Sequence, residues 1–405
     1  MLKSIMNSKS NKQPTMHISL NSLITALAAA FDLAGSSERQ HSLRTAYVAT
    51  RLAKNLDIET KQVEDIYFAS LLHDLIPQGS LFDQNLIFEI LTGLPLRAEV
   101  GTQVAELWKH KQETRRGEYD SGHLGVAARI IYAAEYFENI YCRKQNDEYL
   151  LRKTLFAWSS KAVAELDQKI ALALQECMRE EAFWQDLKEN RIPSAARQIA
   201  PDLWQQLEID EIEQVSRSFS LLIDRKNPYT GQHSQWVGVI AGELARLYGL
   251  DTGMVCQLRI AGYLHDLGKL SIPEYILNKP GLLNEREMQH IKAHPYNSYA
   301  VLSEIEGFEN IARWAGNHHE RMDGSGYPWG RKDLTICDQI IAVADFYEAL
   351  TSDRPYRQAL KSSEALSLID KQAKAGKIMP EACELLKQTI AEQKWKATNK
   401  LRVIV

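Results

Sequence analysis

Apolar side chains recur three and four positions apart in several long stretches of this chain, which is the spacing of one face of an α-helix. The pattern is clear in residues 48–56 and 237–247, and it returns in residues 162–174 and 365–385. Alternating apolar and polar positions joined by hairpin dipeptides, which are typical of paired strands, do not appear. The pattern predicts an all-α protein.

The chain also repeats itself. At an offset of 192 residues a His-Ser pair and a Leu-His-Asp-Leu segment recur, at His41-Ser42 and Leu72–Leu75 and again at His233-Ser234 and Leu264–Leu267. Farther along the offset is 210 residues, where residues 130–138 align with residues 340–348. The first copy is therefore about eighteen residues shorter between these segments, as after a duplication with a deletion.

The two copies meet near residue 200. Residues 190–200 carry Pro193 and small polar side chains, which is typical of a linker, and residues 203–222 have the apolar spacing of a connecting helix. A chain of 405 residues is also long for one ordinary domain. We predict two helical domains, covering residues 15–195 and 205–395.

Composition narrows the class of protein. A formal net charge of -4 provides no basic surface for duplex nucleic acid, although a local cluster of Arg and Lys could still bind a small phosphate ligand. The five cysteines lack CxxC spacing, which suggests reduced thiols. Residues 1–14 are polar and residues 20–34 are interrupted by polar side chains, so no membrane span is predicted. We expect a cytoplasmic protein.

The second copy carries an ordered set of histidines and aspartates. Its members are His233, His265, Asp266, His294, His318, His319 and Asp345. Imidazoles and carboxylates together bind transition metals, and a carboxylate such as Asp266 can bridge two ions. Two ions activate water and stabilise the charge of an in-line attack on phosphorus. A single histidine on an apolar face is more often a hydrogen-bonded core residue, but the complete set favours hydrolysis of a phosphate ester.

A lysine and two loops accompany this set. His265 and Asp266 follow the apolar run 260–264, so we expect them late in a buried helix, with Lys269 one turn farther on. The ammonium of Lys269 would then point towards the group that the metals bind. Gly and Pro residues concentrate in 279–281 and 323–328, which we predict to be loops beside the site.

These segments resemble the HD-GYP family, a branch of the HD phosphohydrolase superfamily, over about residues 210–395. The matching segments are Asn227 to His233, His265 to Lys269, His294-Pro295, His318 to Pro328 with its Asp-Gly-Ser-Gly-Tyr-Pro sequence, and Asp345 to Arg357. The resemblance implies an all-helical HD fold with a binuclear or trinuclear iron or manganese centre. It also implies hydrolysis of a bacterial cyclic dinucleotide such as cyclic di-GMP.

The resemblance further implies residue roles. One metal would be held by His233, His265, Asp266 and Asp345, and the other by Asp266, His294, His318 and His319. Family members that bind three metals carry a Glu four residues before the first His, where this chain has Tyr229. Tyrosine is a poor ligand unless ionised, and its ordinary pKa is about 10. We therefore expect two divalent transition metals, Fe or Mn.

Substrate contacts are carried over in the same way. Lys269, Tyr327, Arg354 and Arg357 are expected to bind the substrate, and Asp266 and Lys269 to act in catalysis. The planar fork of arginine suits phosphate, although an ordinary solvated surface is the alternative for the two arginines.

The first copy resembles an HD domain without the GYP signature. His41, His73, Asp74 and Glu135 keep the order of one HD metal site. The lysine of the HDxGK position is missing, however, and no His-His pair occurs near His110. We interpret this copy as a degenerate regulatory or dimerising domain, with a mononuclear phosphatase as the alternative.

The function predicted from these patterns is that of a cytosolic phosphodiesterase that linearises cyclic di-GMP or 3',3'-cyclic GMP-AMP. One alternative is a hydrolase of another nucleotide phosphate, against which the Asp-Gly-Ser-Gly-Tyr-Pro segment argues. The other is a receptor that binds the cyclic dinucleotide or a protein without turnover, against which the complete ligand set argues. The sequence leaves open the base identity and whether a homodimer or a diguanylate-cyclase-type protein partner forms.

Overall fold

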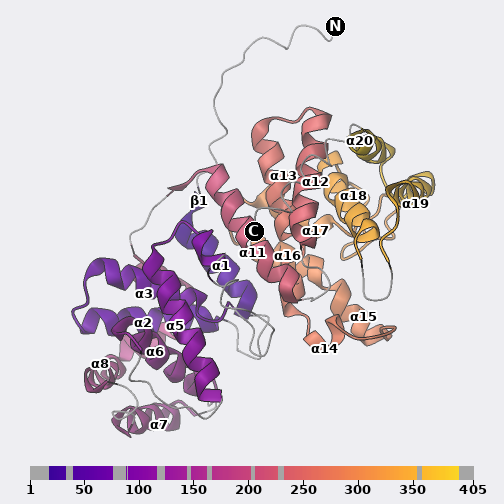
Figure 1. The fold of residues 1–405 in the computed structure, drawn as a ribbon. Helices are drawn as coiled ribbons and strands as arrows, with labels where there is room; N and C mark the ends of the chain where they lie inside the picture. Colours follow the sequence, from indigo (N-terminus) through magenta and orange to yellow (C-terminus); the bar gives the residue numbers. More distant parts are fainter. Residues whose placement is uncertain are drawn as a thin grey trace.

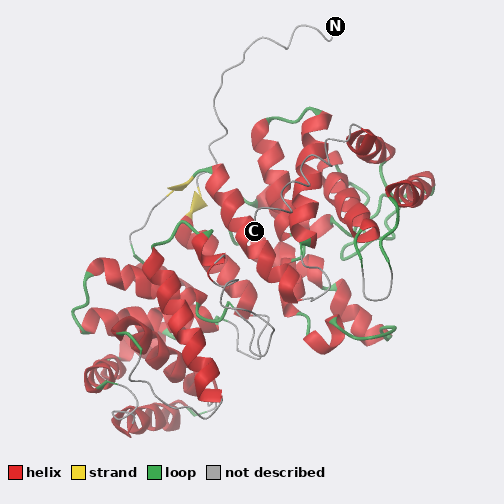
Figure 2. Ribbon diagram, viewed as in Figure 1, coloured by secondary structure: helices red, strands yellow, loops and turns green. Residues whose placement is uncertain are grey.

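The described part of the chain is mainly helical. The computed structural model describes residues 18–32, 40–75, 88, 90–115, 124–143, 147–161, 167–201, 206–226, 232–353 and 358–391. Within these ranges the helices form two groups, and the strands are one short antiparallel pair (Figures 1 and 2). The predicted all-α fold is confirmed. None of the described helices is long and apolar enough to cross a membrane.

The first group is built around one central helix. Its elements are β1 (Ile18–Ser19), α1 (Leu20–Asp32), α2 (His41–Asn55), α3 (Thr60–Leu72), α5 (Ala98–Arg115), α6 (Val126–Arg143), α7 (Glu148–Lys161), α8 (Gln168–Arg179), α9 (Glu181–Asp186) and α10 (Ile192–Ile199). Helix α2 contacts α3, α6, α8 and α10, which explains why most of its side chains are buried.

The second group repeats this plan. Its elements are β2 (Gln206–Leu207), α11 (Ile209–Lys226), α12 (His233–Tyr248), α13 (Thr252–Leu264), the 3-10 helix η3 (Leu267–Ser271), α14 (Glu274–Leu277), α15 (Glu285–Lys292), α16 (His294–Leu302), α17 (Glu309–Asn317), α18 (Ile336–Thr351), α19 (Ser362–Lys374) and α20 (Pro380–Ala391). Helix α12 packs against α13 and α18 just as α2 packs against α3 and α6.

The duplication extends to the helix that precedes each central helix. Asp32, the last residue of α1, accepts hydrogen bonds from the backbone N–H and the hydroxyl of Ser42. Asp224 in α11 accepts the same two bonds from Ser234. Burial raises the pKa of both aspartates to about 6. Each carboxylate satisfies backbone donors at the start of a central helix and so fixes the angle at which the chain enters it.

Two glycines let α12 and α13 cross closely. A Cβ atom added at Gly262 would lie 2.6 Å from the Cα of Gly238, and one added at Gly238 would lie 2.4 Å from the ring of Tyr263. Such distances exclude any side chain at these positions without displacement of the backbone. The close crossing brings His233, at the start of α12, next to His265, which follows α13.

The two groups are joined through the start of the chain. Strand β1 pairs antiparallel with β2, with Ile18 opposite Leu207. Helix α1 contacts η3 and α16 of the second group, and the rings of Phe31 and Phe219 lie 5.9 Å apart. Figure 1 shows α1 and α11 where the groups meet. The domain bounds 15–195 and 205–395 stay a prediction.

Several observed helix limits differ from those predicted from the apolar spacing. The connecting helix predicted for 203–222 begins only at Ile209, after β2, and runs to Lys226. The stretch 365–385 is divided between α19 and α20, because Gly376 has a positive φ of 73° and Pro380 starts the next helix. Part of the stretch 162–174 lies outside the described residues, and α8 begins at Gln168.

Candidate metal centre

Most of the predicted ligands lie at helix ends. His233 and His294 are the first residues of α12 and α16, His318 and His319 follow α17, and Asp345 lies within α18. Helix ends allow side chains from separate helices to converge on one point, which the packed middle of a helix does less readily.

The His-Asp pair lies just beyond a helix rather than late within one. Helix α13 ends at Leu264, and Asp266 already precedes η3. The prediction of a helix running through the pair was wrong because η3 approaches α16 too closely: a Cβ atom added at Gly268 would lie 2.0 Å from the carbonyl oxygen of His294. The Ser298 hydroxyl also ties the turn to α16, since it accepts from the Gly268 N–H at 2.8 Å.

The carboxylate of Asp266 lies between two pairs of imidazoles. Its Oδ2 atom is 3.5 Å from Nε2 of His233 and 3.3 Å from Nε2 of His265. Its Oδ1 atom is 3.2 Å from Nε2 of His294 and 3.9 Å from Nε2 of His318. Each oxygen therefore faces its own pair of nitrogen atoms, as a carboxylate between two metal ions would.

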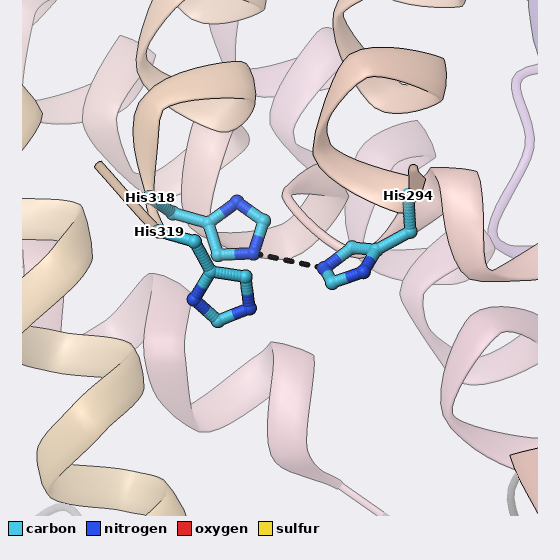
Figure 3. A group of neighbouring side chains, drawn as sticks. All are labelled: His294, His318 and His319. Carbon is cyan, nitrogen blue, oxygen red and sulfur yellow. Dashed lines mark hydrogen bonds between the residues drawn. The ribbon is translucent and has the colours of Figure 1, made fainter. Parts of the chain in front are cut away.

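Asp345 reaches both sides of this arrangement. Its Oδ1 atom lies 3.3 Å from Nε2 of His233, while its Oδ2 atom lies 3.9 Å from Nδ1 of His319. Figure 3 shows His319 beside the His294–His318 pair, whose Nε2 atoms are 3.1 Å apart. The resemblance assigned Asp345 only to the metal held by His233 and His265. In the structure, however, its second oxygen faces His319, which the resemblance assigned to the other metal.

Backbone contacts orient three of the rings. His265, His294 and His318 each use Nδ1 to contact the carbonyl oxygen three residues earlier, at 2.7, 2.6 and 2.5 Å. Because a carbonyl can only accept, Nδ1 carries the proton and the lone pair of Nε2 points towards Asp266. The fold thus selects the tautomer that a metal ligand needs.

Glu348 orients the ring of His233 and was missed in the sequence. Its carboxylate contacts Nδ1 of His233, and the hydroxyl of Ser352 donates to it at 2.5 Å. Burial would lower the pKa of His233, but Glu348 and the two aspartates raise it well above its usual value. The surroundings of His233 therefore favour its protonated, positively charged form. The signal was present in the repeat, because Glu348 aligns with Glu138.

Four further groups, His294, His318, His319 and Asp266, are held in the protonation states that metal binding requires. Burial lowers the pKa of His294, and burial with nearby imidazoles lowers the pKa of His318 well below its usual range and that of His319 to about 3. Burial would raise the pKa of Asp266, but His265 and Lys269 hold it well below its usual range. Neutral imidazoles and ionised carboxylates are the ligand forms of these side chains.

Unpaired buried atoms point to the same chemistry. Among the described residues, Nε2 of His265 and Oδ1 of Asp266 are buried without a hydrogen-bond partner. Leaving such an atom unpaired costs about 1–3 kcal/mol, more for a charged group. Both atoms belong to sets of His and Asp ligand atoms that lie within 4.8 Å of one another. The donor set therefore fits transition-metal ions.

Two predicted substrate residues border the centre. The Lys269 ammonium contacts Asp266, three residues away across η3 rather than along a continuous helix. The ring of Tyr327 lies 4.9 Å from that of His319. Arg354, Arg357 and Tyr229 lie outside the described residues.

Glu320 holds the loop that carries Tyr327. Its carboxylate accepts backbone N–H bonds from residues 329, 330 and 331, at 2.7, 3.1 and 2.9 Å. Gly326 lies so close to this residue that an added Cβ atom would be 2.4 Å from the Cα of Glu320. The loop is therefore closed over its own start, and this positions Tyr327 against His319.

Comparison with known proteins identifies the family. A family model of the HD domain matches residues 217–381, and another HD-domain model matches residues 39–140. The chain belongs to the HD-GYP family. It contains two HD domains, and HD domains are metal-dependent. The recognition made from the motifs is confirmed.

The similarity to curated relatives covers one or both domains of this chain. The 3'3'-cGAMP-specific phosphodiesterase 1 of Vibrio cholerae serotype O1 is 28% identical over 388 residues, covering 89% of this chain and 90% of that protein. A cyclic di-GMP phosphodiesterase of Pseudomonas aeruginosa is 32% identical over 225 residues, covering 54% of each chain. The match to the first relative therefore extends across both HD domains of this chain.

A solved structure has the same fold. The crystal structure of a cyclic GMP-AMP-specific phosphodiesterase of Vibrio cholerae matches with a TM-score of 0.65 and 22% sequence identity, covering 93% of this chain and 98% of that chain. The prediction of tandem HD-domain helical bundles is confirmed.

Proposed function

We propose that this HD-GYP protein is a metal-dependent phosphodiesterase that hydrolyses a bacterial cyclic dinucleotide to the linear dinucleotide, and that its second domain performs the reaction. The observation that carries the proposal is the Asp266 carboxylate, with one oxygen facing His233 and His265 and the other facing His294 and His318. The names of the curated relatives support the reaction class.

The assigned metals are two divalent transition-metal ions, iron or manganese. One is assigned to His233, His265, Asp266 and Asp345, and the other to Asp266, His294, His318 and His319. When bound, such ions activate water and stabilise negative charge at the reacting phosphorus. The donor set of imidazoles and carboxylates suits these metals.

Lys269 and Tyr327 are assigned to the substrate. Lys269 has a side chain 23% exposed and places its positive charge at the edge of the centre, where a phosphodiester oxygen would bind. Tyr327 offers its ring or hydroxyl beside His319. Arg354 and Arg357 stay predicted phosphate contacts, carried over from the family motif.

Among cyclic dinucleotides we favour 3',3'-cyclic GMP-AMP. Two relatives named as specific for it match 89% and 78% of this chain, whereas the relative from Pseudomonas aeruginosa named for cyclic di-GMP matches 54%. Of these three relatives, the two that match most of this chain are therefore the ones named for the mixed dinucleotide. Whether the protein forms a homodimer or binds a diguanylate-cyclase-type partner stays a prediction.

The experiment incubates the purified full chain, loaded with manganese or iron, with each cyclic dinucleotide and identifies products by mass. We expect the linear dinucleotide, formed fastest from 3',3'-cyclic GMP-AMP. His290, an exposed histidine on α15, provides a matched control: His290→Ala retains activity, while His294→Ala loses it. Tight binding of the cyclic dinucleotide without any product would favour the receptor function instead.

A further inference from the structure

Two cations lie beside the loop that carries Tyr327, outside the ligand set described above. Nζ of Lys292 lies 5.6 Å from the centre of the Tyr327 ring. That ring is itself 4.9 Å from the ring of His319, so Tyr327 lies next to both the candidate metal centre and the ammonium of Lys292. Arg321, two residues after His319, is the second cation. Both cations are therefore placed at the border of the centre.

The position of Lys292 is fixed through both ends of its helix. At the start of α15, the Asn284 side chain accepts the backbone N–H of Glu287, and the Glu287 carboxylate accepts that of Asn284. At the end of α15, Nδ1 of His294 contacts the carbonyl oxygen of Ile291, the residue before Lys292. The backbone that carries Lys292 is thus tied directly to a candidate metal ligand, while its side chain is exposed to solvent.

Arg321 is fixed by the loop itself. The loop turns back so closely that a Cβ atom added at Gly326 would lie 2.4 Å from the backbone nitrogen of Arg321. The guanidinium carbon of Arg321 lies 5.6 Å from the centre of the Phe346 ring, which follows Asp345 in α18. Burial and two nearby aspartates raise the pKa of Tyr327, whereas Arg321 acts in the opposite direction. The guanidinium is thus close enough for its charge to act at Tyr327.

Neither cation is neutralised by a carboxylate within the described ranges. Lys292 and Arg321 form no ion pair there, and the contacts that hold their charged groups are with aromatic rings. A ring face attracts a cation only weakly at an exposed site, and it leaves the N–H donors available. Lys269 differs, because its ammonium already contacts Asp266. The border of the centre therefore carries two positive charges that can attract an anion.

A cyclic dinucleotide contains two phosphodiester groups, of which only one is hydrolysed to give the linear product. The function proposed above places the reacting group at the metals, with Lys269 beside it. The other group belongs to the same ring and keeps its negative charge, so cations outside the metal centre are suited to bind it. We propose that Lys292 and Arg321 bind this second phosphodiester beside Tyr327, an inference that rests on the function proposed above.

Contacts of this kind hold the substrate without touching the reacting phosphorus. They act in the bound substrate and in the transition state alike, so their loss should raise KM more than it lowers kcat. They also matter only for a substrate that has a second phosphodiester. A comparison of two substrates therefore separates them from contacts to the reacting group.

The test uses the purified full chain loaded with manganese. One substrate is the cyclic dinucleotide that the wild type hydrolyses fastest, and the other is bis(p-nitrophenyl) phosphate, which has a single phosphodiester. Lys292→Met and Arg321→Met should each raise KM for the cyclic dinucleotide by about tenfold, the lower end for a hydrogen bond to a charged group. KM for bis(p-nitrophenyl) phosphate should change much less in the same variants.

Two further variants serve as controls. Arg286→Met removes a positive charge from the exposed surface of the same helix and should change neither KM. Lys292→Arg keeps a positive charge beside Tyr327 and should keep KM close to that of the wild type. Added salt should raise the KM of the wild type more than that of Lys292→Met, because screening weakens a contact that the variant has already lost.

The outcomes separate this inference from the proposed function. Equal losses with both substrates would mean that the two residues support the fold or the metal centre. Unchanged KM for the cyclic dinucleotide in both variants would place them on an ordinary solvated surface. Either result overturns the inference and leaves the proposed function standing, whereas a wild type that hydrolyses bis(p-nitrophenyl) phosphate but no cyclic dinucleotide overturns both. Because Lys292 is exposed at a helix end, Lys292→Met tests the inference even if Arg321→Met does not fold.

Discussion

The two HD domains of this protein share one half of a metal centre and differ in the other half. Around His41 and His73, as around His233 and His265, two imidazoles face one oxygen of an aspartate. The second oxygen faces Lys111 in the first domain, whereas that of Asp266 faces two further imidazoles. The two sites thus share the pair of imidazoles that faces one oxygen of the aspartate, and they differ in whether a lysine ammonium or two further imidazoles face its other oxygen.

The largest expected effect concerns Asp266, the aspartate at the centre of the second domain. Asp266→Ala should abolish ring opening while helical content stays near that of the wild type, because this carboxylate faces all four imidazoles around it. Initial rates on 3',3'-cyclic GMP-AMP and circular dichroism provide the measurement. Near-normal turnover in this variant would refute the assigned centre.

The second-largest expected effect concerns Glu348 and Glu138, the carboxylates that contact Nδ1 of the first histidine in each site. Glu348→Gln should lower activity or metal affinity by about 10–100-fold, because it weakens the acceptor that orients His233. Glu138→Gln makes the same change beside His41 and should leave ring opening unchanged. Equal losses in the two variants would mean that the second domain depends on the state of the first.

Arg354 and Arg357 should affect substrate binding more than chemistry. Each change to Ala should weaken binding by about 1.5–3 kcal/mol, the worth of a charge-assisted hydrogen bond, and so raise KM with a smaller change in kcat. Arg286→Ala, on the exposed side of α15, is the control. Unchanged Michaelis constants would place the two arginines on an ordinary solvated surface.

The smallest expected effect on ring opening comes from the first domain. The double variant His73→Ala with Asp74→Ala should still form the linear dinucleotide. Point changes are preferable to removal of residues 1–200, because α1 contacts η3 and α16 beside the second centre. If the intact protein also releases the 5'-phosphate of the product and the double variant does not, the first domain is a phosphomonoesterase rather than a regulatory domain.

The sequence by itself determined the helical class, the duplication and the family. Apolar spacing located α2 and α12, because burial of one helix face constrains every third or fourth residue. The ligand types could be read because metal chemistry restricts them to few side chains, which occur here in a recognisable order.

Only the tertiary structure decided how these residues meet. Helix α13 stops before His265 because Gly268 must pass close to His294 in α16, and that contact cannot be read from residues next to the turn. Lys111 binds Asp74 from 37 positions away, and Glu348 reaches His233 from 115 positions away. Apolar periodicity records which face of a helix is buried, but not which distant polar side chain lies opposite. The way in which the helices cross therefore decides which group faces each carboxylate oxygen. At Asp74 that group is the ammonium of Lys111, whereas at Asp266 it is a pair of imidazoles.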